Sequence, residues 1–149
     1  MDRLVSDRKR IVRDLLYARA FNSRNLSLYD RLLTRDILVH DPSVPSGRIQ
    51  GIESFKKTVK EFFSGFPDIR IAVQFQIAER NLVVSYVSLS GTYKGELFGT
   101  PPTGRRFSSP EIEIVRFRGE KICEIWALPD TLGMMQQLGL VAPKAWKLN

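Results

Sequence analysis

Hydrophobic residues in the first part of the chain recur at the spacing of amphipathic helices. Between residues 11 and 21, apolar side chains lie three and four positions apart, which predicts a helix with one buried face. Asn25 or Ser27 can cap a second, short helix, and a third helix is predicted from Ile52. The sequence GFPD at 65–68 ends this third helix, because a proline disfavours the helical conformation of the residue before it. The second helix is expected to carry Leu28, Leu32 and Leu33.

Beyond Ile69 the hydrophobic positions alternate with a period of two, which is typical of half-buried β-strands. Four strands are predicted, over residues 69–77, 81–93, 107–117 and 122–129. The sequence RGEK at 118–121 predicts a tight turn between the last two strands, with Gly119 free to take a positive φ. A final helix is expected to follow and to end at Gly139 as its C-terminal cap.

Helices followed by an antiparallel meander indicate the α+β class, with the helices packed on one face of a curved sheet. The length of 149 residues fits a single domain over 1–149, and 43% hydrophobic residues are enough for a buried core. The second strand is apolar on both faces for part of its length. Because one face can pack against helices while the other lines a cavity, the pattern suits a cone-shaped domain with a pocket at its mouth.

The formal net charge of +7 raises nucleic acid as a partner. Seven basic residues, however, lie in the first 24 positions among acidic ones, as on the solvated side of an amphipathic helix. No apolar run approaches the ~18–20 residues that span a bilayer, and the charged N-terminus is unlike a secretory signal. Cys123 is the only cysteine, so no intramolecular disulfide is expected. We therefore expect a cytosolic protein with neither nucleic acid nor membrane as a partner.

Two stretches in the second half of the chain carry a family pattern. GTYKGELFGTPPTGRRF at 91–107 and RGEKICEIWALPDTLGMMQQLG at 118–139 resemble the SnoaL-like polyketide cyclases, members of the nuclear-transport-factor-2-like group. The sequences LVHDPS at 38–43 and FPD at 66–68 fit earlier positions of that family. The resemblance implies a cone-shaped α+β fold, a curved mixed sheet wrapped by N-terminal helices, and a homo-oligomer, either a dimer or a tetramer.

The segment GELFGTPPTGRRF (95–107) joins two predicted strands through an unusually rigid connection. Pro101 and Pro102 each fix φ, while Gly99 and Gly104 can take backbone conformations closed to other residues. By the resemblance, the connection lies near the mouth of the cone and shapes the pocket. Turn chemistry alone equally allows a rigid crossover that only sets the register of the strands.

Asp130 is the first candidate for acid/base chemistry. The two-residue alternation of the last strand puts it on one face with Glu124, Trp126 and Leu128, although Pro129 can disturb that alternation. If this face lines the cone, desolvation against Trp126 would raise the pKa of Asp130 toward a range useful for proton transfer. An Asp before TLGMM is equally a good helix N-cap. The resemblance favours catalysis, because the matching Asp is the family's acid/base residue.

Other side chains are candidates for lining the pocket. His40, the only histidine, can relay a proton or bind a substrate carbonyl, or it can be a turn residue bonded to the backbone. Tyr93 stands where the family often has His, and a tyrosine is a poor base near neutral pH. Phe98 and Trp126 can stack on a flat ligand or belong to the core, and Glu124 is an inward hydrogen-bonding group or a surface carboxylate. Ligand spacing for a metal site is absent from the sequence.

The resemblance implies a cofactor-free cyclase that acts on a small polyketide or other polycarbonyl substrate. Asp130 would remove an acidic proton, the enolate would attack a carbonyl of the same molecule, and the proton would return to the new alkoxide. The same fold can also serve an isomerase, a dehydratase or an epoxide hydrolase. A binding module without catalysis, in which Asp130 only caps a helix, is a further alternative.

Overall fold

The structure is a computed structural model that describes residues 2–142. Its helical segments are α1 (Arg3–Arg10), the π-helical η1 (Ile11–Asn22), α2 (Leu28–Leu32), α3 (Ile52–Gly65) and α4 (Thr131–Gln137). Its strands are β1 (Leu33–His40), β2 (Arg48–Gln50), β3 (Arg70–Glu79), β4 (Leu82–Thr92), β5 (Arg106–Arg118) and β6 (Lys121–Pro129). The helices and the four-strand meander predicted from periodicity are confirmed.

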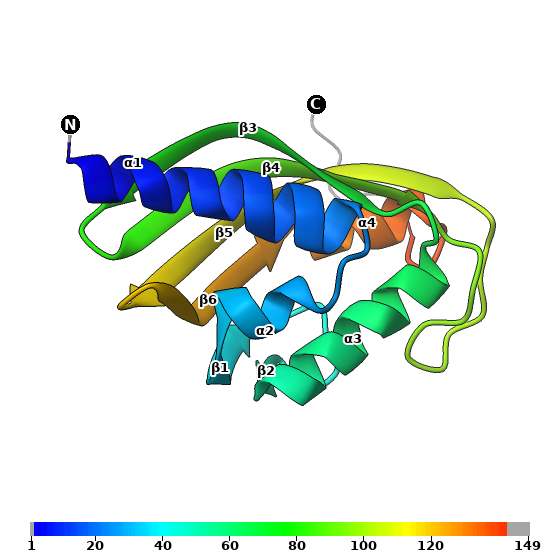
Figure 1. Cartoon of the computed structure of the whole chain (residues 1–149). Coiled ribbons are helices and arrows are strands. Elements are labelled where there is room, and N and C mark those ends of the chain that lie inside the picture. The colour runs from blue at the N-terminus through cyan, green and yellow to red at the C-terminus, as the bar shows by residue number, and fades with distance from the viewer. Residues whose placement is uncertain (1, 143–149) are drawn as a thin grey trace, which may run out of the picture.

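The strands form one six-stranded sheet in the order β2-β1-β6-β5-β4-β3. Neighbouring strands run antiparallel except β1 and β6, which pair in parallel, so the sheet is mixed. Figure 1 shows α1, α2 and α3 on one side of this curved sheet. The α+β class and the curved sheet wrapped by N-terminal helices are confirmed.

The strand over Leu33–His40 was not predicted, and the placement of Leu33 in the second helix was wrong. Leu33 was assigned to a helix, but its extended backbone (φ −104°, ψ 150°) ends α2 and begins β1. The partner that stabilises β1 on one side is β6, which lies far along the chain, and the pairing brings His40 beside Trp126. A strand that depends on such a distant partner leaves a weak local signal, because β-propensity reflects the packing of neighbours.

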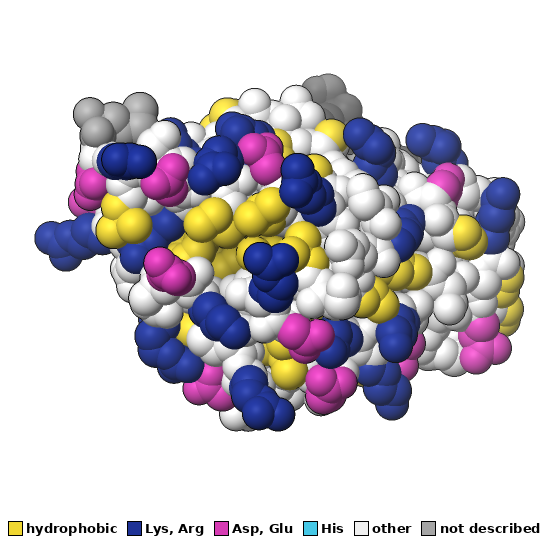
Figure 2. Space-filling model, in the orientation of Figure 1, with side chains coloured by type: hydrophobic (Ala, Val, Ile, Leu, Met, Phe, Trp, Pro, Cys, Tyr) yellow, Lys and Arg dark blue, Asp and Glu magenta, His cyan; other side chains and the backbone are white. Residues whose placement is uncertain are grey.

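The helix formed by α1 and η1 is hydrogen-bonded to the turns of two hairpins. The Asp2 side chain accepts a hydrogen bond from Leu4 N at 3.0 Å and caps α1. The Arg8 guanidinium donates to Arg80 O at 2.7 Å and to Gly119 O at 3.3 Å, at the β3–β4 and β5–β6 turns. On the face drawn in Figure 2, basic and acidic side chains are intermixed around a strip of hydrophobic ones. This distribution matches the solvated helix face expected from the sequence.

The connection between β4 and β5 is held at both of its ends. Gly99 and Gly104 have the expected positive φ values, +78° and +74°. Tyr93 N donates to Arg105 O, and Gly104 N donates to Tyr93 O. Lys94 N and Gly95 N both donate to Gly65 O at the end of α3, and Figure 1 shows the connection passing that end. The connection is therefore a rigid crossover anchored to α3.

Among residues 2–142, none of the helices combines the length and the apolar character that a membrane-crossing helix requires.

Candidate active site

A cavity of about 120 Å³ lies between the inner face of the sheet and the helices that cover it. The strands contribute Val39, Ile49, Ile71, Leu89, Phe107, Glu111, Glu113, Ile125, Ala127 and Pro129 to its lining. The helices contribute Leu16, Tyr17, Phe21, Tyr29, Phe55, Thr58, Val59, Phe62 and Met134, and the connecting segments Asp41, Ser43, Phe66 and Ile69. Within residues 2–142 this lining is mostly apolar and aromatic and includes no Lys, Arg or His.

Two carboxyl groups reach the cavity from β5. The inward positions of this strand alternate with outward ones, and Glu111 and Glu113 share the inward face with Phe107 and Val115. Glu111 is 7% exposed and Glu113 is 9% exposed, so both carboxyl groups are largely removed from water. The strand therefore places two acids, separated by one residue, in a mostly apolar space.

Hydrogen bonding differs between these two acids. The Tyr17 hydroxyl, carried by η1, donates to Glu113 Oε1 at 2.9 Å. Tyr17 is itself only 3% exposed, and packing against the sheet holds its ring in place. Among the described residues, no hydrogen bond reaches the Glu111 carboxyl group. Glu113 is thus positioned by a donor, while Glu111 faces the cavity without one.

A third acid, Asp41, follows β1 and also lines the cavity. Its Oδ1 accepts hydrogen bonds from Ser43 N at 2.8 Å and from Ser43 Oγ at 2.6 Å. Burial nevertheless raises the pKa of Asp41 above its usual value, with the Ser43 hydrogen bonds acting in the opposite direction.

Burial and nearby negative charges raise the pKa values of both glutamates. Burial raises the pKa of Glu113 to about 7, against the lowering effect of the Tyr17 hydrogen bond, and the charge of Asp41 adds to the rise. Burial raises the pKa of Glu111 well above its usual value, and the charges of Glu113 and Asp41 raise it further. The cause is the same in both cases, because a low-dielectric cavity disfavours the charged form of an acid.

The expected inward face of β6 was wrong. The inward residues of this strand are Ile122, Ile125 and Ala127, so Glu124 and Trp126 lie on the opposite, outer face of the sheet. A bulge in the β5–β6 pairing between Arg116 and Phe117 reverses the alternation. Ile122, before the bulge, is therefore buried at an even position, and Ile125 and Ala127, after it, are buried at odd positions, a change that strict two-residue alternation does not allow for.

His40 and two further candidates do come together, but on that outer face. His40 Nε2 lies 2.9 Å from Glu124 Oε2, and the His40 and Trp126 rings stack with centroids 5.3 Å apart. Arg116 Nη1 donates to Glu124 Oε1 at 2.9 Å, and its guanidinium lies 4.8 Å from the centroid of the Trp126 ring. The network joins β1, β5 and β6 across the back of the sheet, away from the cavity.

Asp130 and Leu128 also lie outside the cavity lining. Leu128 is 54% exposed on the outer face. The exposed Asp130 carboxyl accepts a hydrogen bond from Gly133 N at 2.9 Å and forms the N-cap of α4. The neighbouring Pro129 does line the cavity, so Asp130 follows directly on its border. The geometry matches the capping interpretation that the sequence allowed.

Tyr93 and Phe98 support the cavity wall from behind. Tyr93 is 1% exposed, stacks on Phe66, and donates from its hydroxyl to Thr100 O at 2.5 Å. Phe98 has a positive φ of 48° and packs edge-on against Phe62, with ring centroids 5.6 Å apart. Phe66 and Phe62 line the cavity, whereas Tyr93 and Phe98 contact them from outside.

Within residues 2–142, no three or more His, Cys, Asp and Glu side chains lie close enough together to hold a metal ion.

The carboxyl groups that do face the cavity were missed by the sequence analysis, although a signal for them was present. Glu111 and Glu113 have the same parity as Phe107, Val115 and Phe117 in the strand FSSPEIEIVRF. The first and last aromatic residues of that strand mark its buried face, so counting by two from Phe107 leads to both acids.

Comparison with known proteins gives consistent matches. The family model described as SnoaL-like polyketide cyclase matches residues 11–138. The nogalonic acid methyl ester cyclase of Streptomyces nogalater is 31% identical over 80% of this chain and 90% of its own length. The aklanonic acid methyl ester cyclase DnrD of Streptomyces peucetius is 31% identical over 74% of each chain. A SnoaL-like structure from Jannaschia sp. CCS1 superposes with a TM-score of 0.84 at 20% identity, over 97% of this chain and 98% of that one, which shows a shared fold.

Proposed function

We propose a function on one premise: the chain belongs to the SnoaL-like polyketide cyclase family. The proposed reaction is the acid/base-assisted intramolecular aldol cyclisation of a small polycarbonyl substrate bound in the cavity. The observation that carries this proposal is an apolar cavity faced by buried carboxyl groups. Such a cavity orients an apolar substrate, excludes water and raises the pKa of an acid toward the working range of proton transfer.

The chemistry requires only proton transfers from the protein. A carboxylate removes a proton from a carbon between two carbonyl groups, and the negative charge spreads over the substrate as an enolate. The enolate carbon then forms a bond to a carbonyl carbon of the same molecule, and the resulting alkoxide takes up a proton. The side chains bind the substrate, orient it and move protons, while the substrate's own carbonyl groups delocalise the charge.

The lining of the cavity supports an uncharged, flat substrate. The two relatives are cyclases of methyl esters, in which a carboxylate is masked. In residues 2–142 the cavity presents aromatic rings and acids but no cationic side chain that would pair with a free carboxylate. Uncharged esters therefore suit the charge of this lining, since a buried anion without a partner is strongly disfavoured.

The proposal is tested by supplying nogalonic and aklanonic acid methyl esters and following ring closure by chromatography. We expect conversion by the wild type and its loss in Ala127→Phe, because Ala127 is buried on the cavity side of β6 and a larger ring fills the space. Leu4→Phe is the control, since Leu4 is 53% exposed on α1 and lies outside the cavity lining. Failure of the folded wild type to convert either ester would contradict the proposal for this substrate class.

Asp130 stays the candidate for proton transfer that the family resemblance supplies, with His40 as its alternate. Asp130→Asn separates that role from capping, because Asn is isosteric and also a good N-cap. If Asp130 moves the proton, turnover falls by roughly 10²–10⁴-fold while the melting temperature stays constant. If turnover persists, Asp130 serves as the cap of α4 and the proton is moved elsewhere.

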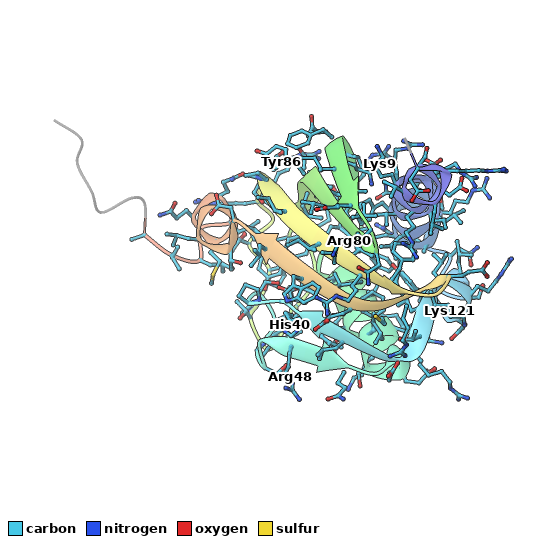
Figure 3. All side chains as sticks on the ribbon, turned by 90° about the vertical axis from the view of Figure 1, so that its left-hand side faces the viewer. Lys9, His40, Arg48, Arg80, Tyr86 and Lys121 are labelled. Carbon is cyan, nitrogen blue, oxygen red and sulfur yellow. The ribbon has the colours of Figure 1, made fainter. Side chains whose placement is uncertain are left out.

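We also propose that the outer face of the sheet forms a homodimer interface. Phe75, Ile77, Ile112 and Leu128 expose 56%, 63%, 43% and 54% of their surface. Figure 3 shows Tyr86 of β4 on the side of the sheet away from the helix that carries Lys9, so this face has no covering helix there. Exposed apolar groups of this extent are typical of interaction surfaces.

A further inference from the structure

The two buried glutamates of β5 call for an explanation beyond the fold. A carboxyl group in an apolar space costs stability unless it is hydrogen-bonded, and apolar side chains at the same positions would avoid that cost. Glu111 is 7% exposed and, among the described residues, receives no hydrogen bond, while its carboxyl group faces the cavity. An unpartnered acid that faces a cavity points to a partner supplied by a ligand.

We infer that Glu111 and Glu113 form the proton-transfer pair of this protein, with Glu113 as the base and Glu111 as the acid. The inference rests on the proposed cyclase function and assigns its acid/base roles to residues inside the cavity. It differs from the family expectation, in which the residue matching Asp130 takes both roles.

Glu113 is the better base because one of its oxygens is already bonded. The Tyr17 hydroxyl donates to Oε1 at 2.9 Å, which favours the ionised form and leaves Oε2 free to accept a proton from carbon. Tyr17 is fixed by packing in the core, so it orients the carboxylate before a substrate arrives. Tyr17 acts through Glu113 and is a positioning residue.

Glu111 is the better acid because everything around it favours its neutral form. The hydrogen bonds of the described residues include none that would stabilise its carboxylate. Glu113 on its own strand and Asp41 after β1 both repel a second negative charge. Tyr17 of η1 and Tyr29 of α2, the other titratable groups near the pair, have pKa values raised by burial and stay neutral. A neutral carboxyl group can donate its proton to an oxygen of the substrate.

The two glutamates share the proton transfers of the proposed step. Glu113 accepts the proton as the substrate C–H bond breaks, and the enolate carbon forms the new C–C bond to the carbonyl carbon. The O–H bond of Glu111 breaks as its proton passes to the alkoxide oxygen. Glu113 then carries the proton taken from the substrate carbon and Glu111 is ionised, and proton exchange with water after product release restores the starting state. Two residues of the same strand, one an acid and one a base, thus take the two roles that a single residue would otherwise have to fill.

Two experiments test the roles of this pair in the variants Glu111→Gln and Glu113→Gln. Glu79→Gln is the control, because Glu79 is exposed on β3. The first measures ester cyclisation. We expect each cavity variant to lose roughly 10²–10⁴-fold in turnover and the control to match the wild type. Tyr17→Phe should move the acidic limb of the pH–rate profile to higher pH, since it removes the donor that lowers the pKa of Glu113.

The second experiment does not depend on the esters. Ring opening of a nitrobenzisoxazole needs only a base that removes a proton from carbon, and it releases a coloured phenolate. We expect the wild type and Glu79→Gln to accelerate it, and Glu113→Gln to fall at least tenfold behind them. Equal rates for Glu113→Gln and the wild type would overturn the pair, whatever the esters show. Conversion of the esters by both glutamine variants at the wild-type rate would also overturn it and would leave the cyclase function standing.

Discussion

Replacing Glu113 by Gln should remove a large part of the pH dependence of folding stability between pH 4.5 and about 7. In the folded protein the pKa of Glu113 rises from 4.5 to about 7, mainly because of burial. The folded state therefore keeps a proton that the unfolded chain has already released. Stability that depends on this proton is complete below the unfolded pKa and is lost as the pH rises through the folded pKa.

The size of the effect follows from that rise. Each pKa unit corresponds to about 1.4 kcal/mol of difference between the two protonation states. A rise from 4.5 to about 7 therefore gives about 3 kcal/mol of unfolding free energy that is lost across the window. Gln has the same shape but does not titrate, so the contribution disappears in the variant.

Urea unfolding at a series of pH values provides the assay, with wild type, Glu113→Gln and the exposed control Glu79→Gln measured in parallel. The difference between wild type and Glu113→Gln cancels every group that titrates alike in both proteins. We expect this difference to fall by about 3 kcal/mol from pH 4.5 to about 7. A difference that stays constant through this window would show that Glu113 titrates as in the unfolded chain, and the reasoning about its burial would be refuted.

Three further predictions concern the crossover and the outer face of the sheet. Gly95→Ala should lower the unfolding free energy by about 3 kcal/mol in urea, because its Cβ would overlap with Ser64 O. Gly99→Ala meets open space and should cost only about 1 kcal/mol. Equal losses for the two variants would contradict this reasoning. Tyr93→Phe should cost about 1 kcal/mol in the same assay through the lost bond to Thr100 O, and an unchanged midpoint would count against an anchoring role. Light scattering should give twice the 17.1 kDa of one chain and the monomer mass for Leu128→Arg; a monomeric wild type would exclude the proposed interface.

The sequence predicted correctly those elements whose structure is determined by residues close together in the chain. The helical stripe from residue 11, the stop at GFPD and the turn at Gly119 are all local patterns, and the structure confirms them. The extended β1 strand was missed because its stabilising partner is β6, and no pattern near Leu33 reports a partner so far away. Local rules succeed where the cause of the structure is local.

The candidate site was harder to predict because it depends on which face of a strand is buried. A bulge in β6 at Cys123 shifts the buried positions from even to odd numbers, so Trp126 lies outside and Ala127 inside, although the larger ring looked like the natural cavity wall. On β5 the alternation is regular, and the same rule leads correctly to Glu111 and Glu113. The two acids were overlooked because charged residues are expected at the surface.

The parallel pairing of β1 with β6 has a consequence for the order in which the protein can assemble. β1 and β2 precede α3 in the chain, but β6, the strand that separates them from β5 in the sheet, follows β5. Until β6 arrives, the β1–β2 hairpin has an open edge, and the meander of β3 to β5 is a separate half. Joining the halves closes a very long loop, a slow and entropically costly event. The cavity is therefore complete only once β6, which contributes Ile125 and Ala127 to its lining, pairs with β1 on one side and with β5 on the other.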